Sequence, residues 1–180
     1  MSRIGRLPVA IPAGVEVTFA NNVIKVKGKL GELTQEIDPK INVKIENNEV
    51  ILTRASEENN VKAKHGLYRA LIANMVKGVT EGYTRKLVVN GVGYKVQKQG
   101  NDVVMNIGFS HTITVKAIDG VKLDCPTATE IVVSGIAKDK VGEMAASIRA
   151  LKKVEPYHGY GIKYDDEVVI RKQGKTAGKK

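Results

Sequence analysis

Two short stretches decide the fold of this 180-residue chain: E-V-I-L-T-R at Glu49–Arg54 and E-I-V-V-S-G at Glu130–Gly135, about eighty residues apart. Each is rich in the β-branched residues that are typical of strands. Each is followed by a run with helical spacing of apolar residues, from about Val61 to Val79 and from about Val141 to Lys153. A strand-plus-helix pattern that occurs twice predicts an internal duplication.

The two helical runs are amphipathic, which predicts that each packs one face on a sheet. In the first run, apolar residues stand four apart in two rows that we expect to be buried: Leu67, Leu71 and Met75, beside Tyr68, Ile72 and Val76. In the second run the stripe consists of Val141, Met144, Ala145, Ile148 and Leu151. Asn60 and Asp139 are expected to be N-caps, because their side-chain oxygens can accept the unpaired amides of a first turn.

Short runs of alternating apolar and polar residues lie upstream of each helix and predict half-buried strands. They begin at Val15, Val23 and Ile41 in the first half, and at Lys86, Tyr94, Asp102 and Thr112 in the second half. Where two such runs must reverse, the chain has Asn21-Asn22, Asn47-Asn48 and Gly100-Asn101. These residues tolerate a positive φ at low cost, so we expect antiparallel hairpins.

The predicted fold class is α+β, with two duplicated units, each a small antiparallel sheet with one helix packed on one face. We expect the boundary near Gly82, which gives a first unit at residues 1–82 and a second at residues 83–180. The first unit carries 12 basic and 9 acidic residues, net +3, and the second carries 17 and 10, net +7. The charge therefore favours the second unit as the one that binds an anionic partner.

The chain as a whole is basic, with a net charge of +10 and a pI near 9.6, which favours nucleic acid or a membrane surface as partner. A basic solvated surface without a partner is the alternative. No apolar run approaches the ~20 residues that span a bilayer, and the N-terminus M-S-R-I-G-R-L-P lacks the apolar segment of a secretion signal. A single cysteine, Cys125, fits a reducing cytosol. We therefore expect a cytoplasmic protein without a membrane partner.

Motifs for catalysis or cofactor binding fail in detail. G-K-T at Gly174–Thr176 would end a P-loop, but Val169 stands where that motif needs a glycine. G-V-G-Y-K-V at Gly91–Val96 resembles the opening of a dinucleotide fingerprint, yet Val96 takes the place of the third glycine. The three histidines, His65, His111 and His158, do not stand at metal-ligand spacing. We therefore expect no catalytic residue, no cofactor and no metal site.

The stretch E-P-Y-H-G-Y-G-I-K-Y-D-D-E at Glu155–Glu167 holds three of the six tyrosines of a chain that is only 4% aromatic. Its proline and glycines argue against a helix. Glycine lets a backbone approach a phosphate, tyrosine offers a flat ring and a hydroxyl, and Lys163 adds charge, so this loop has the chemistry of an RNA contact. An ordinary turn whose tyrosines cap the sheet is the alternative.

The last ten residues, R-K-Q-G-K-T-A-G-K-K at Arg171–Lys180, contain five positive charges and no negative one. The segment is too polar to fold alone and is predicted to be a tail that becomes ordered on an anionic surface. It adds to the positive charge of the second unit.

Several longer motifs are spread along the chain: M-S-R-I-G-R-L-P-V-x-I-P at the start, H-G-L-Y-R-A-L-I-A-N-M-V-K-G-V-T-E-G-Y at His65–Tyr83, V-N-G-V-G-Y-K at Val89–Lys95, G-F-S-H at Gly108–His111, S-G-I-A-K-D-K-V-G-E-M-A-A-S-I-R at Ser134–Arg149 and the loop at Glu155–Glu167. Together they are highly specific. Nearly end to end, the chain resembles the bacterial ribosomal protein L-six family, also called universal large-subunit protein six.

The resemblance implies a non-catalytic, structural constituent of the large ribosomal subunit that binds large-subunit ribosomal RNA mainly through its second unit. It implies a position at the base of the flexible stalk, near the sarcin-ricin loop. Neighbouring large-subunit ribosomal proteins are the other implied partners, and no small-molecule substrate is expected. By analogy, the expected rRNA-binding residues are Gly91, Gly93, Tyr94, Lys95, Arg149, Lys153, Tyr157, His158, Gly159, Tyr160, Gly161, Lys163, Tyr164, Arg171, Lys172, Lys175, Lys179 and Lys180.

The chain departs from the family pattern at two places. The family loop usually reads P-Y-K-G-K-G, and here His158 and Tyr160 replace both lysines. Thr112 stands where a proline commonly follows G-F-S-H. The alternative function is that of a small cytosolic enzyme that acts on an anionic metabolite, with His158 and Tyr160 as proton-transfer groups.

Overall fold

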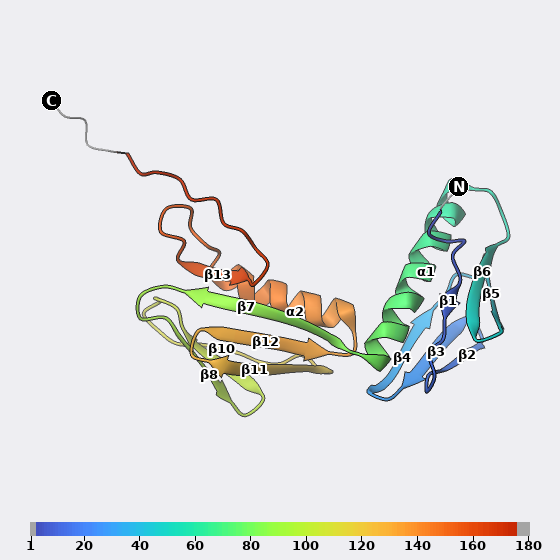
Figure 1. Ribbon diagram of the computed structural model, residues 1–180, viewed down its shortest axis with the longest axis horizontal. Coiled ribbons are helices and arrows are strands. Elements are labelled where there is room, and N and C mark those ends of the chain that lie inside the picture. The colour runs from blue at the N-terminus through green and yellow to red at the C-terminus, as the bar shows by residue number, and fades with distance from the viewer. Residues whose placement is uncertain (1–2, 176–180) are drawn as a thin grey trace. The chain divides into compact units, whose positions relative to one another are not determined.

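The computed structural model describes residues 3–175, so the expectations for Lys179 and Lys180 lie outside the described residues. The chain divides into two compact units (Figure 1). The first consists of the chain up to Tyr83 together with Ile136–Lys138, and the second consists of Thr84–Gly135 and the chain from Asp139 onward. Each unit combines one α-helix with antiparallel strands, which confirms the predicted α+β class.

In the first unit the helix α1 spans Asn59–Thr80, and the strands are β1 Val9–Ala10, β2 Glu16–Ala20, β3 Val23–Gly28, β4 Gly31–Glu36, β5 Ile41–Glu46 and β6 Glu49–Arg54. The strands form two three-stranded antiparallel sheets, with the orders β1-β6-β5 and β2-β3-β4. α1 packs against strands of both sheets, chiefly β3 and β6.

In the second unit the helix α2 spans Lys138–Leu151, and the strands are β7 Tyr83–Asn90, β8 Lys95–Gln99, β9 Asp102–Asn106, β10 Ile113–Val115, β11 Val121–Thr127, β12 Glu130–Gly135 and β13 Gly161–Tyr164. They form a four-stranded sheet with the order β11-β12-β7-β13 and a three-stranded sheet with the order β10-β9-β8.

The second unit repeats the first, with β7 to β12 in the places of β1 to β6 and α2 in the place of α1. The order β11-β12-β7 matches β5-β6-β1, and the order β10-β9-β8 matches β4-β3-β2. The predicted duplication is therefore confirmed. In each unit the strands divide between two sheets where the sequence predicted one, because an alternating pattern marks a strand without naming its neighbours.

The two units differ at one sheet edge. In the first unit β1 has two residues and lies between Pro8 and Pro12, and proline has no backbone N–H to donate to a further strand. The Pro8 carbonyl instead accepts a hydrogen bond from Arg69 (Nη2–O 3.3 Å). In the second unit β7 has eight residues, and its Leu87–Asn90 end pairs with β13. The fourth strand is thus a feature of the second unit.

Each unit has its own apolar core, built from the inward side chains of alternating strands and from one helix face. In β3 the side chains of Ile24 and Val26 are buried while their neighbours face solvent, as the alternation predicts. The largest fully buried side chains of the second unit come from both of its sheets, from the residue after β9 and from α2: Leu87, Met105, Ile107, Ile131, Ile148 and Ile162.

The predicted hairpin turns are confirmed by their backbone angles. Asn21 and Asn22 have φ of 50° and 60°, and Asn47 and Asn48 have φ of 51° and 60°. Two successive residues at positive φ match the right-handed twist of the flanking strands, which is the geometry of a tight two-residue hairpin. Gly100 also has a positive φ, 64°.

The predicted N-caps are wrong. α1 begins at Asn59, so Asn60 lies within its first turn, and the cap position is Glu58, which makes no side-chain cap hydrogen bond. Asp139 lies inside α2, which begins at Lys138. A polar residue before an apolar stripe locates a helix start only to within one or two residues.

The buried face of α1 is rotated from the predicted rows. Ile72, Met75 and Val76 are buried as expected, but Leu67 is 53% exposed, and that prediction is wrong. The face includes His65, whose Nε2 lies 2.9 Å from the Leu52 carbonyl oxygen and can donate to it. This bond makes burial of a polar ring tolerable. In α2 the stripe is buried except for Leu151, which is 36% exposed.

The N-terminal motif and the motif that starts at His65 are contact partners. Gly5 lies against the His65 ring, so that a Cβ at this position would stand 2.6 Å from Nδ1. Arg69 donates hydrogen bonds to the carbonyl oxygens of Leu7 (3.2 Å) and Pro8 (3.3 Å). Glycine and arginine at these two positions therefore hold the N-terminal segment on α1.

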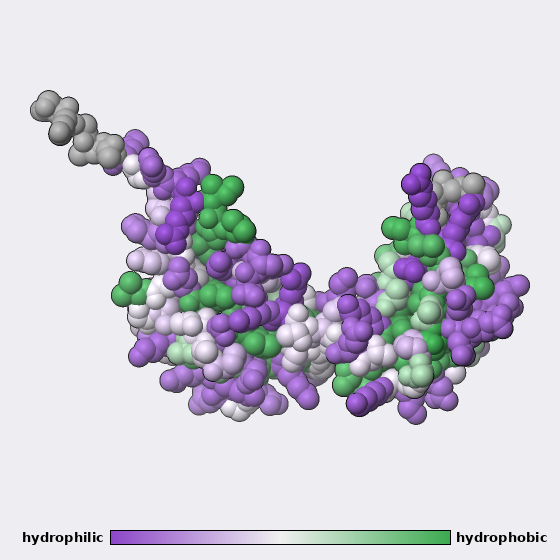
Figure 2. Space-filling model, in the orientation of Figure 1, coloured by the Kyte–Doolittle hydropathy of each residue, from purple (hydrophilic) through white to green (hydrophobic). Residues whose placement is uncertain are grey.

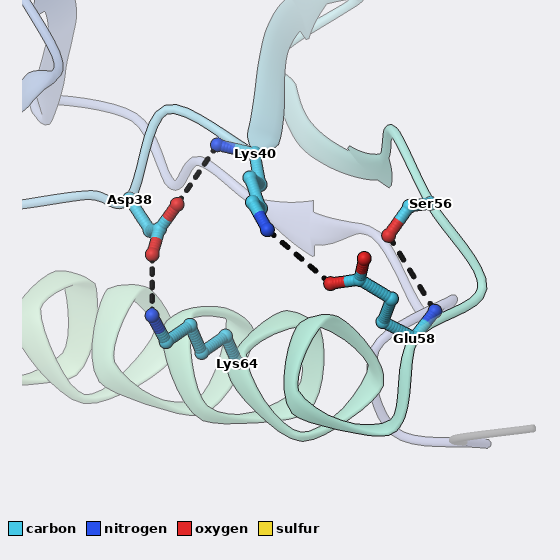
Figure 3. Close-up of polar contacts among 5 residues, drawn as sticks. All are labelled: Asp38, Lys40, Ser56, Glu58 and Lys64. Carbon is cyan, nitrogen blue, oxygen red and sulfur yellow. Dashed lines mark hydrogen bonds and ion pairs between the residues drawn. The ribbon is translucent and has the colours of Figure 1, made fainter.

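A chain of polar contacts ties the β4–β5 connection to the first turns of α1 (Figure 3). One Asp38 oxygen accepts the backbone N–H of Lys40 at 2.9 Å, and the other pairs with the Lys64 ammonium. The Lys40 ammonium pairs with Glu58 at 3.2 Å, and Ser56 accepts the Glu58 backbone N–H at 3.4 Å. The hydrogen bond from Lys64 is the main reason why the pKa of Asp38 lies below its ordinary value of 3.8.

We predict that Asp38→Asn reduces the stability of the first unit above pH 3.8 and loses this effect at lower pH. A carboxyl whose folded pKa is lowered contributes stability above its unfolded pKa and loses it as pH falls through the folded pKa. Asparagine can still accept the Lys40 amide, so the variant isolates the charge. Urea unfolding at pH 6 and pH 3 measures the gap between the two proteins.

The matched control places the same substitution in a Lys64→Met background, where the gap should be much smaller at pH 6. A gap that is equally large at both pH values would show that the Asp38 charge is not its cause.

Candidate nucleic-acid interface

Four segments from three separate regions of the sequence meet at one end of the second unit. Asn90 donates from Nδ2 to the Gly159 carbonyl oxygen at 3.0 Å, and the Tyr94 ring lies against Gly108. Lys152, just after α2, places its ammonium near the Tyr94 ring. We call this surface the loop end; it consists of Gly91–Lys95, Gly108–Thr112, Lys152–Lys153 and Glu155–Tyr160. In Figure 2 the end of this unit where β7 finishes shows pale and hydrophobic residues among hydrophilic ones.

The Gly91–Lys95 turn connects β7 to β8 and is closed by a hydrogen bond from the Tyr94 N–H to the Gly91 carbonyl (3.2 Å). A Cβ at Gly91 would stand 2.4 Å from the Tyr94 ring, and Gly93 has a φ of 76°, so both positions favour glycine. Lys95 is exposed. The predicted residues of this turn therefore lie together, with Tyr94 folded over the turn and half-buried.

The Glu155–Tyr160 loop is organised by a carboxylate. Glu155 accepts backbone N–H groups from Tyr157 (2.7 Å), His158 and Tyr160 (3.4 Å), and its own N–H bonds the Tyr160 carbonyl at 3.0 Å. Burial acts to raise the pKa of Glu155, but the amides outweigh it and the pKa is lowered. Sequence reasoning missed this role, because a glutamate before a proline carries no signal for loop closure.

Three side chains of this loop point outward. Tyr157 is 53% exposed, and the rings of His158 and Tyr160 stack with centroids 5.4 Å apart and an interplanar angle of 18°. The backbone amides of the loop are already used by Glu155, so the loop offers flat rings and hydroxyls to a ligand more than N–H groups.

Other predicted residues are engaged inside the unit. Arg149 donates from Nε to Glu167 at 2.8 Å and pairs with it again through Nη2. The hydrogen bond from Arg149 is the main cause of a lowered Glu167 pKa. The Tyr164 ring lies within 5.5 Å of the guanidinium groups of both Arg85 and Arg149. Lys163 donates to the Glu167 carbonyl at 3.3 Å. Arg149, Lys163 and Tyr164 thus hold the chain after β13 in place.

Gly161 has a packing role as well, because a Cβ there would stand 2.7 Å from the carbonyl oxygen of Lys153. The neighbouring Lys153 side chain is exposed. Lys153 therefore presents its charge to solvent at the loop end. Gly161 allows β13 to pass close to the backbone of Lys153.

The first part of the basic tail runs beside the Glu155–Tyr160 loop, which we call the tyrosine loop. The Lys172 N–H donates to the Pro156 carbonyl at 2.8 Å, and the Arg171 guanidinium lies against Gly159. Lys175 is exposed. These three residues extend the positive charge of the loop end.

Phe109, His111 and Lys152 also belong to the loop end, although they were not among the expected binding residues. In the sequence, the G-F-S-H motif marks Phe109 and His111, whereas no motif marks Lys152. The described part of the chain contains no cluster of three metal-ligating side chains. Neither helix within residues 3–175 is long and apolar enough to cross a membrane.

Comparison with known proteins assigns the chain that carries these motifs to one family. The family model described as Ribosomal protein L6 matches residues 11–82 and 90–165, one segment in each unit. The chain is 53% identical to the large ribosomal subunit protein uL6 of Clostridium kluyveri, 54% identical to that of Clostridium beijerinckii and 52% identical to that of Borrelia garinii subsp. bavariensis, with 100% of each chain covered. The chain belongs to the ribosomal protein L6 family.

Proposed function

We propose that this chain is a structural component of the large ribosomal subunit in the cytoplasm and that it binds large-subunit ribosomal RNA through the loop end of its second unit. The observation that carries the proposal is the convergence of three family motifs and the tail on one exposed surface. Neighbouring ribosomal proteins are further partners, and the position is at the stalk base, near the sarcin-ricin loop.

The chemistry of the loop end suits RNA. Exposed rings from Tyr157, His158 and Tyr160 stand beside basic residues that have no acidic partner in the contacts described above: Lys95, Lys153, Arg171 and Lys172. Phosphate contacts from such residues position an RNA, and planar side chains stack on unpaired bases.

The internal contacts divide the expected residues into two roles. We assign direct RNA contact to the exposed residues of the turn, the loop and the tail. Arg149, Lys163, Tyr164 and Gly161 are assigned a positioning role, because their groups hold β13 and the following segment. Loss of a positioning residue disturbs the loop end without removing a phosphate contact.

The alternative of an enzyme is not supported. His158 and Tyr160 stack on each other at an exposed loop, and the imidazole Nδ1 stands 3.5 Å from Glu155, whose carboxylate closes that loop. The stacking of the two rings and the contact with Glu155 are accounted for by a binding surface and need no catalytic role.

The unit that binds RNA can be identified by removing charge from each unit in turn. Lys95→Gln combined with Lys153→Gln should weaken binding and reduce the steepness of the log affinity versus log salt plot by about 0.7 to 0.9 for each phosphate that is no longer neutralised. Filter binding of the full-length protein to transcribed large-subunit RNA measures both. The control pair, Lys27→Gln with Lys29→Gln in the first unit, should change the slope little; an equal effect of the control pair would contradict the assignment.

The tail is tested by truncation. Truncation after Ile170 removes Arg171 and Lys172 together with the residues beyond them, and should flatten the salt dependence by about 0.7 to 0.9 per phosphate contact. Truncation after Gln173 keeps the two residues that lie beside the loop. The difference between the two truncations isolates their contribution, and identical slopes for both truncations and the intact chain would exclude the tail from binding.

A further prediction concerns the tyrosine loop. Tyr160→Ala should weaken binding about 5- to 150-fold, the equivalent of ~1 to 3 kcal/mol for one stacked base, with an unchanged salt slope. Tyr160→Lys should steepen the slope by about one contact. Melting temperatures of the same variants provide the control, since a loss of stability without a loss of affinity would mean that Tyr160 only packs within its own unit.

A further inference from the structure

A second aromatic pair lies at the loop end, formed by Phe109 and His111. Their ring centroids are 6.1 Å apart, with an interplanar angle of 24°. The first pair, His158 and Tyr160, comes from a different loop and has nearly the same geometry. The Gly91–Lys95 turn and the residue before it touch both loops, through the Tyr94 contact with Gly108 and the Asn90 bond to Gly159.

The exposure of Phe109 is built into the backbone. Ile107 is fully buried, and Gly108, with a φ of 79°, then turns the chain so that Phe109 is 41% exposed. A Cβ at Gly108 would stand 2.9 Å from the Tyr94 ring. The chain contains only two phenylalanines and no tryptophan. Leaving one of the two at the surface forgoes the gain of burying a large apolar ring, and a ligand that covers the ring would recover this gain.

Lys152 holds this pair next to the basic surface. Its ammonium lies 4.7 Å from the centroid of the Phe109 ring and 5.8 Å from that of Tyr94, within the range of cation–π attraction. Its carbonyl accepts the Ile162 N–H at 2.8 Å, so the backbone below it is fixed to β13. A positive charge therefore stands beside the flat rings, as a stacked nucleotide with its phosphate requires.

We propose that Phe109 and His111 form a stacking site for an unpaired base of the bound RNA, with Lys152 next to it to attract the phosphate of that nucleotide. The inference rests on the proposed function and adds a binding site to it. The base must be unpaired, because bases in a duplex are already stacked and their faces are not accessible. The site lies within the basic loop end, which favours RNA over an apolar protein surface.

Filter binding of the full-length protein to transcribed large-subunit RNA tests the site with three variants. Phe109→Leu keeps apolar bulk but loses the flat ring, and should weaken binding about 5- to 150-fold with an unchanged salt slope. Phe109→Tyr keeps the ring and should bind like the original protein. Lys152→Gln should flatten the slope by about 0.7 to 0.9.

The matched control is Ile118→Ala. Ile118 is 36% exposed and precedes Asp119, whose carbonyl contacts Lys140 near the start of α2, away from Lys152 after its end. This variant should leave the affinity unchanged. A chemical footprint should show an unpaired base that is protected by the original protein and by Ile118→Ala and is reactive again with Phe109→Leu.

The outcomes separate the two proposals. If the original protein does not bind the RNA, the proposed function fails. If it binds and Phe109→Leu binds equally well with the same footprint, the stacking site is refuted while the proposed function stands. If Phe109→Leu binds free RNA normally but is absent from assembled large subunits, Phe109 contacts a neighbouring protein and the stacking site is also refuted.

Discussion

The pairing of β13 with β7 is the constraint on which the loop end depends. Four residues of β13, from Gly161 to Tyr164, pair with Asn90 to Leu87, and the Ile162 side chain between them is fully buried. The loop before β13 and the segment after it are thereby fixed to the same sheet edge. Glu155 then closes the loop through backbone amides, and Arg149 with Glu167 fixes the chain that follows. Without the strand pairing, these short polar contacts would have to order a free chain against its conformational entropy.

The internal duplication shows how one architecture can differ at a single sheet edge. Both units bury the apolar face of one helix, and in the first unit that face packs against strands of both sheets. The difference lies at an edge, where Pro8 and Pro12 flank a two-residue β1 and β7 is long enough to receive another strand. A very short edge strand with prolines beside it resists strand addition. The surface that we assign to RNA is thus built on the edge that remained open to pairing.

The charged side chains at and near the loop end fall into two groups, those that bind groups of their own chain and those that face solvent. Glu155 in the loop end and Glu167 in the segment after β13 both act on their own chain, by binding backbone amides and by pairing with Arg149. The positive charges that remain exposed, such as Lys95 and Lys153, are those without such a partner in these contacts. Net charge alone overstates the number of basic residues that can contact a phosphate. A basic side chain in an ion pair inside the unit is already neutralised by its acidic partner.

The sequence by itself determined the α+β class, the duplication, the Asn-Asn hairpins and the family, because these depend on periodicity and on local backbone preference, which short segments carry on their own. It also placed Leu67 in the core, which is wrong. Only the tertiary structure decided that His65 enters the core through its bond to Leu52 and that Arg149 pairs with Glu167. It also brought Phe109 and Lys152 to the loop end. These contacts join residues that are distant in sequence. The pattern of a single segment does not identify which distant residue will contact it in the folded chain.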